Sequence, residues 1–396
     1  MNNQNNANYR RQSEQEAANR FANVNLEGIA DEIYTLCKDQ HGCRFLQKKL
    51  EENNSTYLEL IFKETYSHIV ELMIDPFGNY LCQKLLEYST VEQRTLLVKT
   101  AAPFLIKIAL NQHGTRALQK MIEYVNTPEQ ILMIVDSLKT NVVKLIKDLN
   151  GNHVIQKCLN HLSNDDSQFI FDAVSQNCIE VGTHRHGCCV LQRCIDHASD
   201  SQKKQLIDEI IKNALSLVQD PFGNYVVQYV LDLNRFEYSE MLIEQFFGNI
   251  YLLSMQKFSS NVIEKCIRIA SFEKCQVLIS ELVSNGLFLE NLLRDSFGNY
   301  VIQTAIEFAD DQTKEFLIKA IKPVLPSIRN TPYGRRIQSK IANLNGADSL
   351  SLDGLIISNN DVQQFNMSQL QQNLLQEQQQ QMLQQHQQQK TQLDVN

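Results

Sequence analysis

A short segment of this chain recurs at an almost constant interval, and internal repetition of this kind limits the possible folds more than any other sequence feature. The segment reads GNYLCQKLL from Gly78, GNHVIQKCL from Gly151 and GNYVIQTAI from Gly298. Its second residues are 36, 36, 37, 36, 36, 36 and 39 positions apart; they are Cys43, Asn79, Thr115, Asn152, Cys188, Asn224, Ser260 and Asn299. A degenerate further copy starts at Gly334, so the pattern predicts eight repeats followed by a C-terminal cap.

Each segment has the apolar spacing of an amphipathic helix. We number it from Cys43 or its equivalent as position one, so that Val154 and Ile155 occupy positions three and four of their copy. Positions three, four, seven and eight are almost always apolar, whereas positions one, two, five and six are polar or aromatic. At about 100° per residue these two sets fall on opposite faces of one helix. Lys49, at position seven of the first copy, is the one clear exception.

A second apolar stretch precedes each of these helices, for example at residues 69–73 and 142–146. A turn such as Asp75–Gly78 joins the two, and strand signals are scarce, so the unit is helix, turn, helix. A unit of this size cannot bury its apolar face alone. We therefore expect an all-α solenoid from about residue 24 to about residue 344, with the second helices side by side on one surface.

The two ends of the chain differ from the repeats in composition. Residues 1–20 are rich in Asn, Gln and Arg, and residues 347–396 end in a glutamine-dominated tail. Neither has the apolar density that a packed core requires, so both are expected to be disordered. The expected repeat domain is 21–346, with its cap near 329–346.

Composition excludes several classes of protein. No run of about 18 apolar residues indicates a membrane span, and the N-terminus lacks the apolar stretch of a secretory signal, so a cytosolic or nuclear protein is expected. Ten cysteines lie scattered among apolar positions without zinc-type pairs, which indicates reduced thiols. A net charge of −8 argues against nonspecific binding to duplex phosphates.

The polar stripe of the repeated helix has an unusual composition. Asn occupies position one four times, and Gln occupies position five in seven of the eight copies. Helix propensity does not explain this choice, because Asn is a mediocre helix former. Positions one and five are one turn apart, so they present two hydrogen-bonding side chains to the same planar partner, and an aromatic or Arg side chain at position two could stack on it. The alternative is a stripe that is merely solvated and is kept by shared repeat ancestry.

These eight registered copies and the terminal copy resemble the PUF (Pumilio) family, most closely its fungal eight-repeat members. The resemblance implies a right-handed, crescent-shaped α-solenoid with terminal caps that binds single-stranded RNA, one base per repeat. It also implies that the RNA runs antiparallel to the protein. The implied base-edge residues are Cys43 with Gln47, Asn79 with Gln83, Thr115 with Gln119, Asn152 with Gln156, Cys188 with Gln192, Asn224 with Gln228, Ser260 with Glu264 and Asn299 with Gln303.

In the code of that family, pairs with Asn and Gln select uracil, pairs of Cys or Thr with Gln select adenine, and the pair with Glu selects guanine. The implied site is 5′-UGUAUAUA-3′. The implied stacking residues are Arg44, Tyr80, Arg116, His153, Tyr225, Asn261 and Tyr300. Cys189 departs from the pattern, because Arg is common at the stacking position of the fifth repeat in relatives and a thiol offers less surface. A nine-nucleotide site with one flipped base stays open.

The resemblance further implies a post-transcriptional regulator that binds 3′ untranslated regions of messenger RNA in the cytoplasm, as a monomer and without a cofactor or catalytic residues. Deadenylation, decay or translation-repression factors would bind its convex surface. Two alternatives remain: a protein-interaction scaffold of HEAT or armadillo type that holds an extended peptide, and a PUF-like ribosome-biogenesis factor with relaxed specificity.

Three further features have competing interpretations. Position six is usually basic (Lys48, Lys84, Lys120, Lys157, Arg193, Lys265), which indicates either phosphate contacts or ordinary solubilising charge. The cluster from His184 to Cys189 contains metal-ligand and nucleophile residue types, but its repeat register indicates a turn, so we expect neither a metal site nor an enzyme. The 39-residue step implies an insertion near 284–288, where Phe288 would be an exposed anchor for a partner or a packed side chain.

Overall fold

The structure, a computed structural model, describes residue 21 and residues 24–346. The chain divides into two compact units, Met1–Lys340 and Ile341–Asn396, and the repeats lie in the first. The flanking segments 1–20 and 347–396, for which disorder was expected, lie outside the described residues. The described residues form helices joined by short turns and contain no strand, as expected for an α-solenoid.

Each repeat contributes a short middle helix, an inner helix and an outer helix, in that order along the chain. The middle helices are α2 (Ile33–Cys37), α5 (Ile69–Ile74), α8 (Leu105–Leu110), α11 (Val142–Lys147), α14 (Cys178–Gly182), α17 (Ala214–Leu217), α20 (Ile250–Ser254) and α23 (Gly286–Arg294). The inner helices are α3 (Gln40–Glu51), α6 (Gly78–Tyr88), α9 (Gly114–Tyr124), α12 (Gly151–His161), α15 (Gly187–His197), α18 (Gly223–Asp232), α21 (Ser259–Ile269) and α24 (Gly298–Phe308). The outer helices are α4 (Ser55–Thr65), α7 (Val91–Ala101), α10 (Pro128–Leu138), α13 (Gln168–Gln176), α16 (Asp200–Lys212), α19 (Phe236–Glu244), α22 (Phe272–Val283) and α25 (Asp311–Ile321).

Short 3-10 helices and a terminal pair of helices complete the array. The 3-10 helix η1 (Leu26–Glu32) precedes α2, and η2 (Tyr66–His68), η3 (Ala102–Phe104) and η4 (Lys139–Asn141) join outer to middle helices. After α25 come α26 (Leu325–Ile328) and α27 (Pro332–Gly346), which contains the degenerate copy at Gly334.

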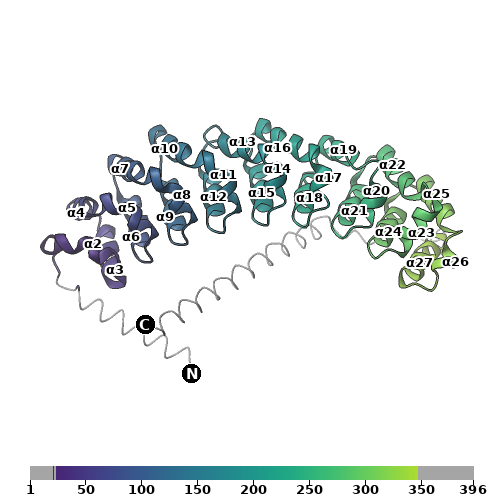
Figure 1. Cartoon of the computed structure of the whole chain (residues 1–396), viewed down its shortest axis with the longest axis horizontal. Helices are drawn as coiled ribbons and strands as arrows, with labels where there is room; N and C mark the ends of the chain where they lie inside the picture. Colours follow the sequence, from purple (N-terminus) through teal and green to yellow (C-terminus); the bar gives the residue numbers. More distant parts are fainter. Residues whose placement is uncertain (1–20, 22–23, 347–396) are drawn as a thin grey trace, which may run out of the picture. The chain divides into compact units, whose positions relative to one another are not determined.

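The inner helices form one continuous row, as the sequence predicted. Successive inner helices from α3 to α24 pack directly against one another. Within the unit that contains the repeats, the inner helices line the concave side of an arc, while the outer helices lie along its convex side (Figure 1). One surface therefore displays positions one, two and five of every repeat.

The core consists of the apolar positions that the repeat pattern predicted. In α12, for example, Val154, Ile155 and Cys158 are fully buried. The exception, Lys49, lies at the N-terminal end of the array, where no earlier repeat stacks. Its ammonium group pairs with Glu52 at 2.8 Å and lies over the ring of Tyr57, 5.0 Å from the ring centroid, so its methylene groups cover apolar surface while its charge stays near water.

The glycine that begins most inner helices is required by a close approach of the backbone. A Cβ atom on Gly223 would lie 2.5 Å from the carbonyl oxygen of Leu217, six residues earlier. The seventh repeat has Ser259 there instead, and its hydroxyl donates to the equivalent carbonyl of Leu253 at 2.6 Å. A hydrogen bond thus replaces the glycine contact in that repeat.

The additional residues of the 39-residue step lie at the start of α23, within the region predicted from the sequence. This helix has nine residues, against six in α5, and Asn285 caps its N-terminus by accepting from the Leu287 amide. Phe288 stacks on Tyr251 of the preceding middle helix at 4.3 Å between ring centroids, yet 37% of its surface stays exposed. Phe288 is thus partly packed and partly available.

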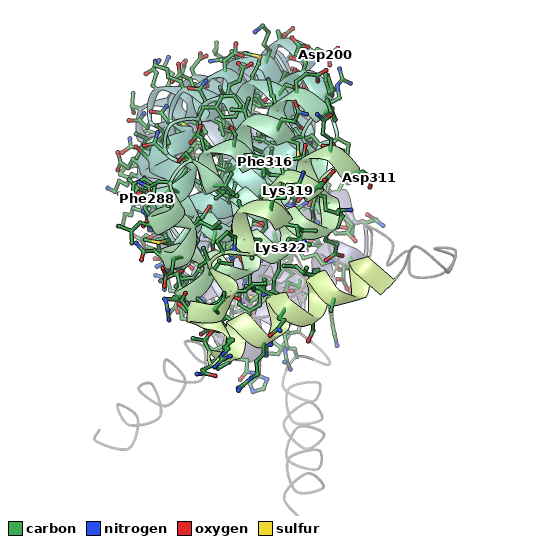
Figure 2. The ribbon with its side chains drawn as sticks, turned by 90° about the vertical axis from the view of Figure 1, so that its right-hand side faces the viewer. Asp200, Phe288, Asp311, Phe316, Lys319 and Lys322 are labelled. Carbon is green, nitrogen blue, oxygen red and sulfur yellow. The ribbon has the colours of Figure 1, made fainter. Side chains whose placement is uncertain are left out.

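The C-terminal end of the repeat array is largely polar. Figure 2 looks at this end, where Phe316 and Lys319 of α25 and the following Lys322 face the viewer. Lys319 pairs with Glu315 at 2.7 Å, and Phe316 is a large exposed apolar side chain among these polar groups. A polar outer face is what a terminal repeat needs, because no further repeat covers it. No helix of the described part is long and apolar enough to cross a membrane.

Candidate nucleic-acid interface

In four repeats the turn before the inner helix holds the position-one side chain in place. In the second repeat the Asp75 carboxylate accepts from the amides of Phe77 and Gly78, both at 2.8 Å. The carbonyl groups of Asp75 and Pro76 in turn accept from Asn79 Nδ2, at 2.9 and 3.0 Å. The same arrangement recurs at Asn152, Asn224 and Asn299. Asn at position one is therefore anchored by its amide nitrogen, with its oxygen facing position five.

Position five completes the pair in all four of these repeats. The Gln side chain donates its Nε2–H to the Oδ1 atom of the position-one Asn. The distances are 3.2 Å for Gln83 to Asn79, and 2.9 Å for Gln156 to Asn152, Gln228 to Asn224 and Gln303 to Asn299. The Asn side chains are buried, whereas the Gln side chains are half-buried. Each Gln keeps its carbonyl oxygen and a second N–H, a complementary donor and acceptor, for a planar partner.

The first and third repeats use a smaller group at position one, and it is tied to the next repeat. The Cys43 thiol donates to the carbonyl oxygen of Phe77 at 3.1 Å, and the Thr115 hydroxyl donates to that of Asn150 at 3.0 Å. Gln47 Nε2 lies 3.2 Å from Cys43 Sγ, and Gln119 Nε2 lies 3.4 Å from Thr115 Oγ1. These two Gln side chains are also half-buried, so they face the same surface as the others.

The fifth repeat departs from this arrangement at several atoms. Cys188 donates to Arg185 of its own turn at 3.4 Å instead of to the next repeat. Gln192 donates to the carbonyl oxygen of Tyr225 at 3.4 Å and is only 6% exposed, so it is the least accessible of the position-five side chains. Cys189, at position two, has its sulfur 4.0 Å from that of Cys188; this contact lowers the pKa of the Cys189 thiol.

The seventh repeat carries a carboxylate at position five. Glu264 Oε2 accepts from Arg268 Nη2 at 3.0 Å and from the Thr304 hydroxyl at 2.7 Å. Ser260, at position one, is buried beside it in the same register as the asparagines. The acceptor-only chemistry of Glu264 suits a partner with two adjacent donors.

The expected stacking residues project from the row of inner helices. Tyr80 and Tyr300 are 45% and 44% exposed. Arg44, Arg116, His153 and Asn261 are also exposed, and Tyr225 is half-buried. The sequence interpretation missed Arg336, which donates to the Tyr300 hydroxyl at 3.2 Å. The repeat register could have identified Arg336, because it occupies position two, the expected stacking position, of the degenerate copy at Gly334.

Position six forms a ladder of polar contacts between neighbouring repeats. Its side chain reaches an acidic residue at position nine of the preceding repeat; we call this the inter-repeat ladder. The pairs are Lys84 with Glu51, Lys157 with Glu123, Tyr229 with Asp196, Lys265 with Asp232 and, in the terminal copy, Lys340 with Glu307. Lys120 and Lys157 together lower the pKa of Glu123 to about 2. Phosphate contacts by these cations, expected as one possibility, would have to compete with carboxylates.

The cluster from His184 to Cys189 consists of a turn at residues 184–186 and the first residues of α15, as its repeat register indicated. His186 is 8% exposed, and burial lowers its pKa to about 4. The amide of His186 donates to His184 Nδ1 at 3.3 Å, which places His184 where Asp75 stands in the second repeat. No group of three or more potential metal-ligating side chains comes together in the described residues.

The repeat pattern and its geometry agree with one family of known proteins. The family model described as the Pumilio-family RNA binding repeat matches this chain at eight segments; they are residues 32–65, 68–99, 105–139, 141–175, 177–211, 213–245, 249–283 and 291–322. The chain belongs to the Pumilio (PUF) family. Its repeats therefore form a PUF RNA-binding domain.

Individual PUF proteins are similar over most of this domain. A Pumilio domain-containing protein of Schizosaccharomyces pombe is 55% identical over 309 residues, which cover 78% of this chain and 45% of that protein. Pumilio homology domain family member 4 of Saccharomyces cerevisiae is 63% identical over 156 residues, 39% of this chain and 18% of that protein. The chain thus spans less than half the length of these relatives.

Solved PUF structures contain the same solenoid. The Puf4 RNA-binding domain bound to the HO endonuclease RNA 3′ UTR recognition sequence has 48% identity and a TM-score of 0.68, over 77% of this chain and 97% of that one. The RNA-binding domain of yeast Puf5p bound to SMX2 RNA has 36% identity and a TM-score of 0.73, over 80% and 97%. PUF domains similar to this one are thus seen with RNA bound, and the family is one of RNA-binding proteins rather than enzymes.

Proposed function

We propose that this PUF domain is a sequence-specific reader of single-stranded RNA with the preferred site 5′-UGUAUAUA-3′. The observation that carries the proposal is the row of eight registered pairs at positions one and five on consecutive inner helices. The RNA-bound relatives support the concave row as the RNA-binding surface. The base at each step follows from the chemistry of its pair.

The four Asn–Gln pairs suit uracil. In each pair the Asn holds the Gln amide, which keeps one donor and one acceptor directed outward. Uracil presents an N–H beside a carbonyl oxygen, so it complements that edge. Asn79, Asn152, Asn224 and Asn299 with their Gln partners are therefore assigned to the four uracils.

The remaining pairs suit purines. A Gln amide also complements the amino group and ring nitrogen of adenine, and the smaller Cys43, Thr115 and Cys188 leave room for a larger base. Guanine offers two adjacent donors on its Watson–Crick edge, which match the carboxylate of Glu264 beside Ser260. The exposed groups at position two would stack on the base faces, and each such contact contributes about 1–3 kcal/mol.

The fifth repeat is where an additional base would be accommodated. Gln192 is turned toward Tyr225, and Cys189 provides little stacking surface. A base opposite this repeat is therefore held more weakly than its neighbours. This supports a nine-nucleotide site, with one base flipped out of the row, as a second accepted form of the target.

In the cell, we propose a cytoplasmic and monomeric regulator of messenger RNA stability and translation that binds 3′ untranslated regions. The Puf4 structure, whose RNA is a 3′ UTR recognition sequence, supports the choice of target region. Decay or translation-repression factors would bind the convex surface. The exposed side chains of Leu287 and Phe288, at 64% and 37%, are candidate contacts.

Selection of bound sequences from randomised single-stranded RNA tests this function. We expect enrichment of UGUA followed by an A/U-rich 3′ half, in eight- and nine-nucleotide forms. A matched control with Gln83, Gln156, Gln228 and Gln303 all changed to Ala should lose enrichment at the four uracils alone. Flat enrichment by the unaltered protein would refute sequence-specific reading, and peptide binding without RNA binding would favour a scaffold.

A further inference from the structure

The Glu264 carboxylate, at position five of the seventh repeat, is held by two side chains that lie outside positions one, two and five. Thr304 comes from α24 of the next repeat, 40 residues further along the chain, and donates to Glu264 Oε2 at 2.7 Å. Arg268, one helical turn beyond Glu264 on α21, donates to the same oxygen at 3.0 Å. Both donors meet Oε2, so Oε1 is the oxygen that they leave open.

This contact replaces the inter-repeat ladder at the step from the seventh to the eighth repeat. At five other steps a basic or hydroxyl side chain at position six meets an acid at position nine of the preceding repeat, as Lys265 does with Asp232. At this step position nine is the cation Arg268 and position six is Thr304. The seventh repeat, which has a carboxylate at position five, thus has the cation Arg268 one helical turn later. Arg268 and Thr304 both turn toward the carboxylate of Glu264.

The surroundings keep the two donors in place. Thr304 is only 6% exposed, so its hydroxyl has little freedom to turn toward water. The Arg268 guanidinium lies over the ring of Phe308, 5.5 Å from the ring centroid, and its Nη2 is also 3.4 Å from Thr304 Oγ1. The side chain of Glu264 is 16% exposed, so only a small part of its carboxylate is accessible to a partner. Charge-assisted hydrogen bonds of this kind fix the plane of a carboxylate.

We propose that Thr304 and Arg268 are positioning residues for guanine selection by the seventh repeat. They occupy two of the about four lone-pair sites of the Glu264 carboxylate and fix its plane, while the sites facing the RNA stay free for the two donors of guanine. Arg268 also offsets the negative charge that would otherwise face an RNA phosphate backbone. This inference rests on the proposed function, because it assumes that Glu264 reads a base.

The test is the variant Thr304→Val, which removes the hydroxyl and keeps the shape of the side chain. Dissociation constants are measured for 5′-UGUAUAUA-3′ and for the three RNAs that differ at the second base. We expect preference for guanine to fall by about fivefold, with preferences at the other bases unchanged. Thr304→Ser, which keeps the hydroxyl, should retain the preference for guanine. Arg268→Ala should act in the same direction.

Tyr229→Phe is the matched control, because it removes a position-six hydroxyl that meets Asp196 and not a reading residue. It should leave preference at the second base unchanged. In the background of Glu264→Gln, adding Thr304→Val should have no further effect on that preference, because the carboxylate is gone. If the unaltered protein prefers guanine and Thr304→Val retains that preference within twofold, the positioning role is refuted. If the unaltered protein shows no preference at the second base, the proposed reading itself fails.

Discussion

At the scale of single residues, positions one and five of the repeat differ in burial and in hydrogen bonding. Position one is buried and anchored: Asn79 donates to two carbonyl groups of its turn, and Cys43 donates to the turn of the following repeat. Position five is the more accessible partner, and position one orients it. The sequence predicted which residues form the pairs but not this division, because it depends on backbone carbonyls that no residue type reveals.

The seventh repeat can be converted to the chemistry of its neighbours. The double change Ser260→Asn with Glu264→Gln creates the pair that stands at Asn224 and Gln228. We expect preference at the second base of the RNA to switch from guanine to uracil by about tenfold or more, since one matched bidentate pair contributes about 1–3 kcal/mol of discrimination. Fluorescence anisotropy with RNAs varied at that base measures it.

The converse change provides the control. Asn224→Ser with Gln228→Glu should move preference at the third base from uracil toward guanine and leave the second base alone. Retention of guanine by the converted seventh repeat would show that Ser260 and Glu264 do not read it.

The turn at His186 should make stability depend on pH. Burial, with Arg185 as the next contribution, lowers the pKa of His186 to about 4 in the folded protein, against about 6.5 in the unfolded chain. Between these values the unfolded state binds the additional proton. The free energy of unfolding should therefore fall as pH drops from about 6.5 toward about 4, and be fully present above that window.

His186→Phe tests this, because Phe77 and Phe222 occupy the equivalent turn position in other repeats. Urea denaturation at pH values across the window should show a smaller loss of stability in the variant than in the unaltered protein. Equal pH dependence of the two proteins would assign the titration to other groups.

At the scale of helices, the repeat period predicted the inner and middle helices closely, because a burial pattern at positions three, four, seven and eight admits one helical face. Outer helices such as α7 carry no repeated motif of that kind, and the sequence predicted only a unit of helix, turn and helix. Contacts between repeats were harder still. Thr304 and Glu264 are 40 residues apart, and nothing local in either segment indicates that they meet.

Arg94 is one such contact between elements. It is 8% exposed at the start of α7, and its guanidinium donates to the carbonyl groups of Leu86, Ser89 and Tyr124 at the ends of α6 and α9. Arg94→Met would leave these acceptors without their donor inside the protein. We expect a loss of about 2–4 kcal/mol in the free energy of unfolding, measured by urea denaturation.

An exposed cation on an outer helix serves for comparison. Lys204→Met removes a surface pair with Asp208 and should leave the free energy of unfolding nearly unchanged. A similarly small effect of Arg94→Met would mean that water or neighbouring groups satisfy those carbonyls.

At the scale of the whole molecule, the charge distribution indicates an RNA-binding protein that depends little on phosphate attraction. The net charge is −8, and cations of the inter-repeat ladder such as Lys84 and Lys157 face carboxylates. Binding energy would then come mainly from base edges and stacking. Composition alone argued only against nonspecific binding to duplex phosphates, and the basic residues at position six were open to interpretation as phosphate contacts until their partners were visible.

Salt dependence measures this balance. Each phosphate neutralised contributes a slope of about −0.7 to the plot of log binding constant against log salt for single strands. We expect a slope shallower than about −2 between about 50 and about 200 mM salt. A slope steeper than about −5 would show that the cations leave their carboxylates to bind the backbone.

The bond from a position-one side chain to the turn of the next repeat also bears on how such an array can be rebuilt. Cys43 ends on Phe77 and Thr115 on Asn150, and at position five Gln192 ends on Tyr225 of the next inner helix, so part of the setting of one repeat belongs to its successor. An exchangeable cassette is therefore not the 36-residue period itself. A graft that carries the inner helix together with the turn before the next inner helix would transfer specificity. A graft that ends between them would leave the position-one donor without its acceptor.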